Sequence, residues 1–263
     1  PICNINWGRV HSRNLAPSLE PGKIGDTNGN SSFYLNETLL PQRDKGEINT
    51  GTEFWNDKTE PRQAWRYDPG TRRVRQSPGY GFDMSFPGSG GSITVDEVRL
   101  FNGSGQRYDW KIVGKREMYI PYNTYRLHDA KLTYASLLTP GHINPDAMRY
   151  ERHRVWELEG TLKPGYRHLY GKRKLYVDED TWFPMLADNY DNRGELWRTS
   201  MVNYFYAYES QAQQAGVGLY YDLNAGSYLA FNLINEQRNG YLLNKPGFSP
   251  RDFGPEAARR FGQ

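Results

Sequence analysis

Two histidines and one run of carboxylates are the residues of this sequence that come nearest to a metal-binding or catalytic arrangement. His153 and His168 flank Lys163-Pro164-Gly165, which is typical of a tight turn between two strands. A hairpin there would bring the two imidazoles face to face, and a pair of imidazoles can bind a metal ion. Two ordinary strand residues explain the same pattern, and no metal site is predicted.

The carboxylates are Asp178, Glu179 and Asp180, which could bind a cation or act as general acid and base. They fall where a second hairpin turn is expected, and acidic residues are common in turns because their side chains accept hydrogen bonds from nearby backbone amides. Asp188 and Asp191, near the next turn, have the same explanation. The sequence therefore assigns no catalytic residue and predicts no cofactor.

Several motifs that mark catalytic folds are missing from the sequence. There is no H-E-x-x-H pair, no G-x-S-x-G elbow, no Walker loop and no G-x-G-x-x-G ahead of a helix. The Gly-rich stretch 86–92 is not followed by a helical pattern, which favours a flexible loop or a lid over a phosphate-binding loop. Cys3 is the single cysteine. A chain with one cysteine can form neither an internal disulfide nor a metal site with several cysteine ligands.

The charge balance limits the classes of partner. The chain has 33 basic and 30 acidic side chains and a formal net charge of +3, which argues against steering toward nucleic acid. Basic runs at 72–75 and 172–174 fall on predicted strands, where cross-strand salt bridges explain them at least as well as contacts with nucleic acid or anionic lipid. No apolar run approaches the length of a membrane-spanning helix. The chain starts at Pro1 without a signal peptide, which indicates a processed form or a fragment.

Any site in this chain must be positioned mainly by β-strands, and the densest strand pattern is Glu195–Ser210. One face of this strand carries Tyr204 and Tyr206, and the other carries Trp197 and Phe205. A strand that is apolar on both faces needs a cover on each side. One cover can be a helix or a loop, and the other can be a ligand cavity, a partner protein or another sheet.

Turn sequences at regular intervals predict an antiparallel meander, as in a sandwich, a barrel or an open curved sheet. Its expected strands are Arg152–Leu162, His168–Val177, Trp182–Asn189 and Leu196–Tyr208. Residues 1–60 are poorly periodic and are expected to be irregular, as are residues 126–148. Other expected elements are strands at 64–67, 73–75, 95–101, 108–113, 117–120, 220–222 and 228–232, one helical turn at 211–215 and a short helix at Pro255–Arg260.

Aromatic residues make up 14% of the chain, and tryptophan recurs about once per predicted strand. Core packing explains many of these residues, but a sheet packed on one side does not need so many of them on both faces. They are therefore candidates for the lining of an apolar cavity. The candidate ligand-binding residues are Trp65, Tyr67, Trp110, Tyr122, Trp156, Trp182, Trp197 and Phe205.

Several of these motifs together resemble the bacterial DUF1329 family. The stretches that carry the resemblance include PRQAWRYDPGTRRVR at 61–75, RYDWKIVGKRE at 107–117, RYERHRVW at 149–156 and YVDEDTW at 176–182. They follow one another in the family's order over residues 60–260. The family is similar to the periplasmic lipoprotein carriers of the LolA and LolB type, and its members usually carry a signal peptide and a longer N-terminal part.

The resemblance implies a mainly β fold, namely a strongly curved, incompletely closed antiparallel barrel with a few short helices on its concave side. Its apolar interior would accept acyl chains. Residues 61–263 would form this domain, and residues 1–60 would belong to a larger N-terminal portion. The implied location is the periplasm of a Gram-negative bacterium, where the protein can be peripheral to the outer membrane.

The preferred hypothesis is a non-enzymatic carrier or chaperone for a lipid or other hydrophobic molecule, linked to outer-membrane lipid trafficking or export. A second hypothesis is an accessory subunit that docks through exposed aromatics to an outer-membrane partner or to a transporter of the resistance–nodulation–division class, because family genes often lie near such exporters. A third is a hydrolase that uses carboxylates such as Asp178 and Asp180. Nucleic acid is not an expected partner.

Overall fold

The computed structural model describes residues 7–14, 29–56, 58–77, 80–209, 211–237 and 250–262. The chain divides into two compact units, one formed by residues 1–81 with 245–263 and the other by residues 82–244. Each unit has its own antiparallel sheet and its own apolar core. Among the described residues, no helix is long and apolar enough to cross a membrane. Cys3 lies outside the described residues.

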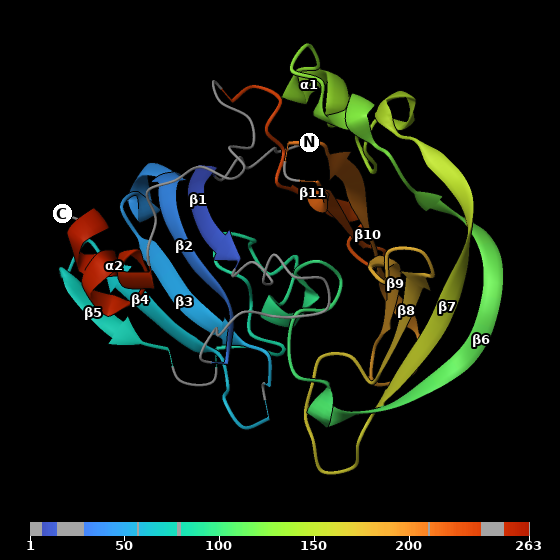
Figure 1. Ribbon diagram of the computed structural model, residues 1–263, viewed down its shortest axis with the longest axis horizontal. Helices are drawn as coiled ribbons and strands as arrows, with labels where there is room; N and C mark the ends of the chain where they lie inside the picture. The colour runs from blue at the N-terminus through green and yellow to red at the C-terminus, as the bar shows by residue number, and fades with distance from the viewer. Residues whose placement is uncertain are drawn as a thin grey trace. The chain divides into compact units, whose positions relative to one another are not determined.

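The first unit is a five-stranded sheet that a C-terminal helix covers. Phe33, Leu35, Ile48 and Tyr67 are buried on one face of the sheet, where Phe253 and the helix α2 pack against them (Figure 1). The strands lie in chain order and are β1 (Trp7–Asn14), β2 (Asn30–Leu40), β3 (Ile48–Phe54), β4 (Gln63–Asp68) and β5 (Arg73–Gln76). The helical segments are η1 (Gln42–Asp44), η6 (Pro250–Asp252) and α2 (Pro255–Phe261).

The predicted hairpin across residues 68–71 is confirmed as β4 and β5, and the predicted terminal helix is confirmed as α2. The expectation of irregular backbone over residues 1–60 is wrong for β1, β2 and β3. Strands β2 and β3 are rich in Asn, Ser and Thr, and only residues such as Phe33, Leu35 and Ile48 give them an apolar face. β3 pairs with β4 in register, for example Ile48 with Tyr67, so the first sheet continues across residue 60.

The second unit is a seven-stranded antiparallel sheet in the order β12-β11-β10-β9-β8-β7-β6. Its outer strands β12 and β6 do not pair with each other, so the sheet stays open, and it is strongly curved (Figure 1). The expected open antiparallel fold with few helices is therefore confirmed. The strands are β6 (Tyr108–Pro121), β7 (Tyr150–Leu162), β8 (Lys172–Asp178), β9 (Pro184–Tyr190), β10 (Leu196–Ala207), β11 (Ala212–Asp222) and β12 (Ser227–Phe231).

Two elements of this sheet differ from the sequence prediction. The two short strands expected at 108–113 and 117–120 are one long strand, β6, with a register break between Ile112 and Gly114. The helical turn expected at 211–215 is wrong, because these residues begin β11 and pair with β10. The residues there are Ala and Gln rather than β-branched or aromatic, and the long ladder with β10 overrides their weak strand propensity.

An irregular segment, residues 82–107, packs on the sheet of the second unit. Its buried Ile93 and Leu100 join the main core with strand residues such as Val177 and Val202. The strand expected at 95–101 is wrong, because the segment instead forms a 3-10 turn whose acidic side chains are buried. The short helical segments of this unit are η2 (Val95–Glu97), η3 (Gly105–Arg107), η4 (Tyr125–His128), α1 (Tyr134–Leu137) and η5 (Pro145–Ala147).

Candidate functional site

A buried ionic network fastens the irregular segment to the sheet. Arg173 on β8 is fully buried and donates to the Asp96 carboxylate at 2.8 Å, to the Asn189 side chain at 3.0 Å and to the Leu100 carbonyl at 3.2 Å. His168 lies 3.0 Å from the same Asp96 oxygen. Arg173 and Asn189 are register partners on adjacent strands, so the sheet itself presents this set of donors.

A second buried ion pair, Arg198 with Glu97, lies beside the pair of Arg173 with Asp96. Arg198 on β10 donates to Glu97 at 3.4 Å, to the Tyr170 hydroxyl at 2.9 Å and to the Gly91 carbonyl at 2.9 Å. Asn189 also donates to Glu97 at 3.1 Å, which links the two pairs into one network. Because buried charges are tolerated only when they are paired and hydrogen-bonded, this network specifies where the irregular segment lies on the sheet.

The protonation state of this network follows from its contacts. The backbone amide of Tyr170 donates to His168 Nδ1, so Nε2 of His168 carries the hydrogen and donates to Asp96. Burial raises the pKa of Asp96, but the Arg173 guanidinium and the hydrogen bond from His168 outweigh burial and hold this pKa well below its usual range. Asp96 is therefore ionised in the folded protein at neutral pH.

The depressed pKa of Asp96 predicts a loss of stability in acid. A carboxyl group whose pKa falls on folding stabilises the protein above its unfolded-state pKa of about 4, and this contribution is lost as the pH falls toward the folded-state pKa. We expect the stability advantage of the natural protein over Asp96→Asn to shrink by about 1.4 kcal/mol per pH unit below about pH 4. Urea unfolding at pH 7, 5, 4 and 3 measures it, and a constant difference across these values would contradict the prediction.

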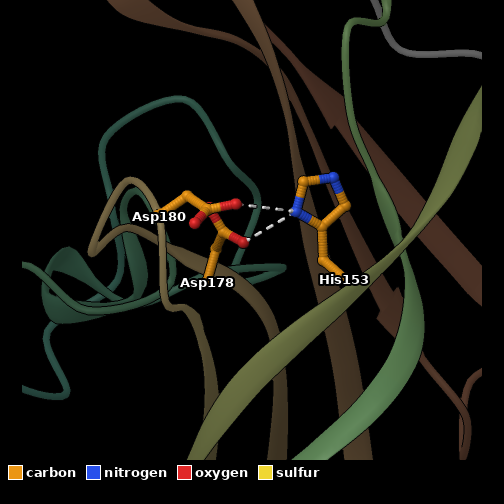
Figure 2. A group of neighbouring side chains, drawn as sticks. All are labelled: His153, Asp178 and Asp180. Atoms are coloured by element: carbon orange, nitrogen blue, oxygen red, sulfur yellow. Dashed lines mark hydrogen bonds and ion pairs between the residues drawn. The ribbon is translucent and has the colours of Figure 1, made fainter.

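A second group of polar side chains lies at the end of the β8–β9 hairpin (Figure 2). His153 on β7 places Nδ1 3.0 Å from Asp178 and 3.6 Å from Asp180. The Asp178 side chain is fully buried, and its other oxygen accepts hydrogen bonds from the backbone amide and the hydroxyl of Thr181 at 3.0 and 2.8 Å. The ring of Tyr122 stacks on the His153 imidazole with centroids 4.1 Å apart. Ligand atoms of His153, Asp178 and Asp180 all lie within 4.8 Å of one another.

The turn role expected for the acidic run is confirmed, since Asp178 closes the turn through Thr181. His153 and His168 do not face each other, so the alternative in which they form a metal-binding pair is wrong. A tight turn centred on Pro164 would pair His153 with Leu175, whereas β8 begins only at Lys172 and Val155 pairs with Asp178. The longer connection shifts the register, so that His153 meets the acidic turn and His168 joins the buried network.

Aromatic side chains continue from the core to the surface at the same hairpin. The Trp182 indole is 68% exposed and stacks on Trp156, which packs against the main core. Phe183, 39% exposed, stacks on the buried Tyr204 with ring centroids 5.1 Å apart. Trp182 has a φ of +60°, in the left-handed region that bulky residues seldom adopt. We call Trp156, Trp182 and Phe183 the aromatic patch.

The other residues predicted to line a cavity lie in several separate places in the structure. Trp65 and Tyr67 belong to the first unit, where Tyr67 is buried in the small core beneath α2. In the second unit, Trp110 and Tyr122 pack against the main core, and Trp197 lies against Tyr170 and donates to Asp222. Phe205 lies against the rings of Tyr125 and His128. The structure therefore brings Trp156 and Trp182 into contact, while Trp197 and Phe205 contact other partners.

The buried network is the feature that sequence reasoning missed. The cross-strand salt bridges that explain the basic run at 172–174 are confirmed for Lys174, which pairs with Glu157 at 2.8 Å. Its middle residue, Arg173, points into the core instead. The available signal was strand alternation: Arg173 lies between two lysines and shares its face of the strand with Leu175, which is the apolar face.

Comparison with known proteins adds a family and a fold. A family model described as a protein of unknown function, DUF1329, matches residues 9–259. An uncharacterized protein of Pseudomonas aeruginosa is 43% identical over 234 residues, which are 89% of this chain and 51% of that protein. The chain thus spans about half the length of this curated relative.

Two solved structures are similar to this one in fold. A domain from Vibrio parahaemolyticus, described as an outer membrane lipoprotein-sorting protein, aligns with a TM-score of 0.55 and 14% identity over 89% of this chain and 80% of that chain. A DUF1329 family protein from Desulfovibrio piger aligns with a TM-score of 0.51 and 16% identity over 83% of this chain and 72% of that chain. At these identities the likeness establishes the shared fold.

Proposed function

Starting from the DUF1329 family, to which this chain belongs, we propose that the protein is a non-enzymatic periplasmic carrier of a lipid or other hydrophobic molecule. The fold it shares with an outer membrane lipoprotein-sorting domain supports this proposal. The observation that carries it is the aromatic patch, through which the core of the open sheet reaches the surface. An acyl chain would bind against the patch by apolar burial.

The patch has the properties that a binding surface for apolar cargo requires. Trp182 is 68% exposed and occupies a backbone position that favours glycine, so the conformational cost of placing an indole there roughly offsets its single ring stack on Trp156. The turn is closed on both sides of this residue, because the Trp182 amide donates to the Asp178 carbonyl at 2.9 Å and the Asp178 amide donates to the Phe183 carbonyl at 3.0 Å. These two hydrogen bonds hold the strained backbone of Trp182 in place and so fix the position of its indole. Strained backbone positions of this kind cluster at binding sites.

Of the two carboxylates named for a hydrolase, Asp178 is not placed to act on a substrate. Both oxygens of Asp178 accept hydrogen bonds within the protein, one from His153 and the other from Thr181. A nucleophile or a general base needs an oxygen that can reach substrate. Asp178 instead shapes the turn that carries Trp182 and Phe183.

Replacing the exposed tryptophan tests the carrier proposal. In Trp182→Gly the relief of a left-handed conformation, roughly 1–2 kcal/mol, offsets the loss of a ring stack, roughly 0.5–1.5 kcal/mol. We therefore expect the free energy of unfolding to change by no more than about 1 kcal/mol. The affinity for a fluorescent fatty acid is expected to fall at least about tenfold, because cargo would lose the apolar area of one indole face.

The matched control is Trp55→Ala, because Trp55 is 58% exposed and belongs to the first unit. This variant should bind the fatty acid as the natural protein does. Unchanged affinity in both Trp182→Gly and Trp156→Ala would remove the aromatic patch from the proposal. A protein that takes up no fatty acid at all, yet co-purifies with a membrane complex, would favour a transporter-accessory role in its place.

A further inference from the structure

We propose that His153, Asp178 and Asp180 form a binding site for one divalent transition-metal cation, with Zn²⁺ as the representative ion. The three residues supply one imidazole nitrogen and two carboxylate oxygens from two different segments, β7 and the β8–β9 turn (Figure 2). This donor set is typical of borderline metal ions, which accept both imidazole and carboxylate ligands.

The distances between the ligand atoms fit a metal ion. Metal bonds of about 2.1 Å place neighbouring ligand atoms roughly 3.0–3.4 Å apart in octahedral or tetrahedral geometry. His153 Nδ1 lies 3.0 Å from Asp178 Oδ1 and 3.6 Å from Asp180 Oδ2. A shift of a few tenths of an ångström at the exposed Asp180 side chain brings its Oδ2 into this range of His153 Nδ1, and all three ligand atoms already lie within 4.8 Å of one another. Because that side chain is 69% exposed, water can occupy the remaining coordination positions.

The residues around the three ligands hold them in place. Thr181 fixes one oxygen of Asp178 and leaves the other directed at His153. Tyr122 stacks on the imidazole and fixes the plane of the ring. Glu151 lies 3.8 Å from His153 Nε2 and is itself held by Asn123 at 2.8 Å. A carboxylate next to the second ring nitrogen is the arrangement that orients metal-binding histidines in many proteins.

Metal binding would exchange one histidine tautomer for the other. Without metal, Asp178 can only accept a hydrogen bond, so Nδ1 of His153 carries the hydrogen. With metal on Nδ1, the bound imidazole carries its hydrogen on Nε2, which faces Glu151, and no group is oxidised or reduced. The cation would also bridge β7 to the turn that carries Trp182, and so restrain that turn.

The test uses all 263 residues of this chain, stripped with a chelator and titrated with Zn²⁺ by calorimetry. We expect one Zn²⁺ per chain, and an affinity at least about tenfold lower in His153→Gln and in Asp180→Asn. Asp180→Asn changes an exposed side chain and so should preserve the fold. The matched controls are His142→Gln, at an exposed histidine, and Asp109→Asn, at an aspartate side chain that is 73% exposed, and both should bind as the natural protein does. Ca²⁺, which prefers six to eight oxygen ligands, should not compete at equal concentration.

A second measurement does not depend on the variants. In ¹⁵N NMR spectra the hydrogen of His153 should move from Nδ1 to Nε2 as Zn²⁺ is added. Failure to bind Zn²⁺, equal binding by His153→Gln and Asp180→Asn, or an unchanged His153 tautomer at saturating Zn²⁺ would each overturn the proposal. None of these outcomes bears on fatty-acid binding, so the metal site and the carrier function are tested separately.

Discussion

Replacing Arg173 with methionine is expected to lower the free energy of unfolding by about 3–5 kcal/mol. Methionine fills a similar volume, but it leaves the Asp96 carboxylate buried without its guanidinium partner and removes the donors to Asn189 and the Leu100 carbonyl. The cost of a lone buried charge exceeds the stabilisation that the intact pair provides, which explains why breaking such a pair is so damaging. Urea unfolding at pH 7, followed by circular dichroism, measures the effect.

The control for this prediction is Arg193→Met, because Arg193 pairs with Asp191 but its side chain is 84% exposed. Screening by water limits such a pair to roughly 0–1 kcal/mol, so the control should unfold close to the natural protein. The double variant Arg173→Met with Asp96→Asn should recover part of the loss, since it removes the unpaired charge. Equal losses in Arg173→Met and Arg193→Met would mean that the buried network does not fasten residues 82–107 to the sheet.

Gly216→Ala is expected to destabilise the protein by about 1–3 kcal/mol through overpacking. A methyl group at Gly216 would overlap the Nε2 atom of His128 and would lie 2.8 Å from the Asn203 carbonyl oxygen. The His128 ring cannot easily yield, because Nδ1 donates to the Thr124 carbonyl and Nε2 accepts from the Val217 amide. Burial lowers the pKa of His128, which keeps the ring in the neutral form that these two bonds require.

Gly114→Ala is the matched control, since a methyl group at Gly114 on β6 meets no atom of the described residues within 4 Å. Without a clash the same substitution should be neutral or stabilise the protein by up to about 1 kcal/mol, because alanine has less backbone freedom to lose on folding. Thermal unfolding of both variants gives the comparison. If His128→Ala fails to relieve any of the loss in Gly216→Ala, the contact with the imidazole is not its cause.

The sheet of the second unit could be predicted where turn residues and aromatic strands alternate. The four strands expected between Arg152 and Tyr208 correspond to β7, β8, β9 and β10, with ends that differ by a few residues. Prediction failed where polar or small residues form strands, as in β2, β3 and the start of β11. Partner strands stabilise those segments, and pairing between distant strands leaves no local pattern in a sequence.

At the candidate sites, too, contacts between residues close in the sequence could be predicted, and contacts between distant residues could not. The turn at Asp178–Asp180 was predictable because its side chains bond to backbone within three residues. The meeting of His153 with that turn was not, because it depends on the length of the connection between β7 and β8. The pairing of Asp96 with Arg173 spans 77 residues, and no periodicity relates the two positions.

The first unit draws on both ends of the chain, and this has a consequence for the order of folding during synthesis. Phe253, Ala257 and Ala258 complete the core over β2, β3 and β4, so that core cannot close until residues beyond the whole second unit have been synthesised. The second unit is continuous in the chain and can fold first, as domains generally do during synthesis. Until Phe253 and α2 are synthesised, the apolar face of the first sheet stays exposed to water. We therefore expect a chaperone that binds exposed apolar surface to protect the nascent first unit from aggregation.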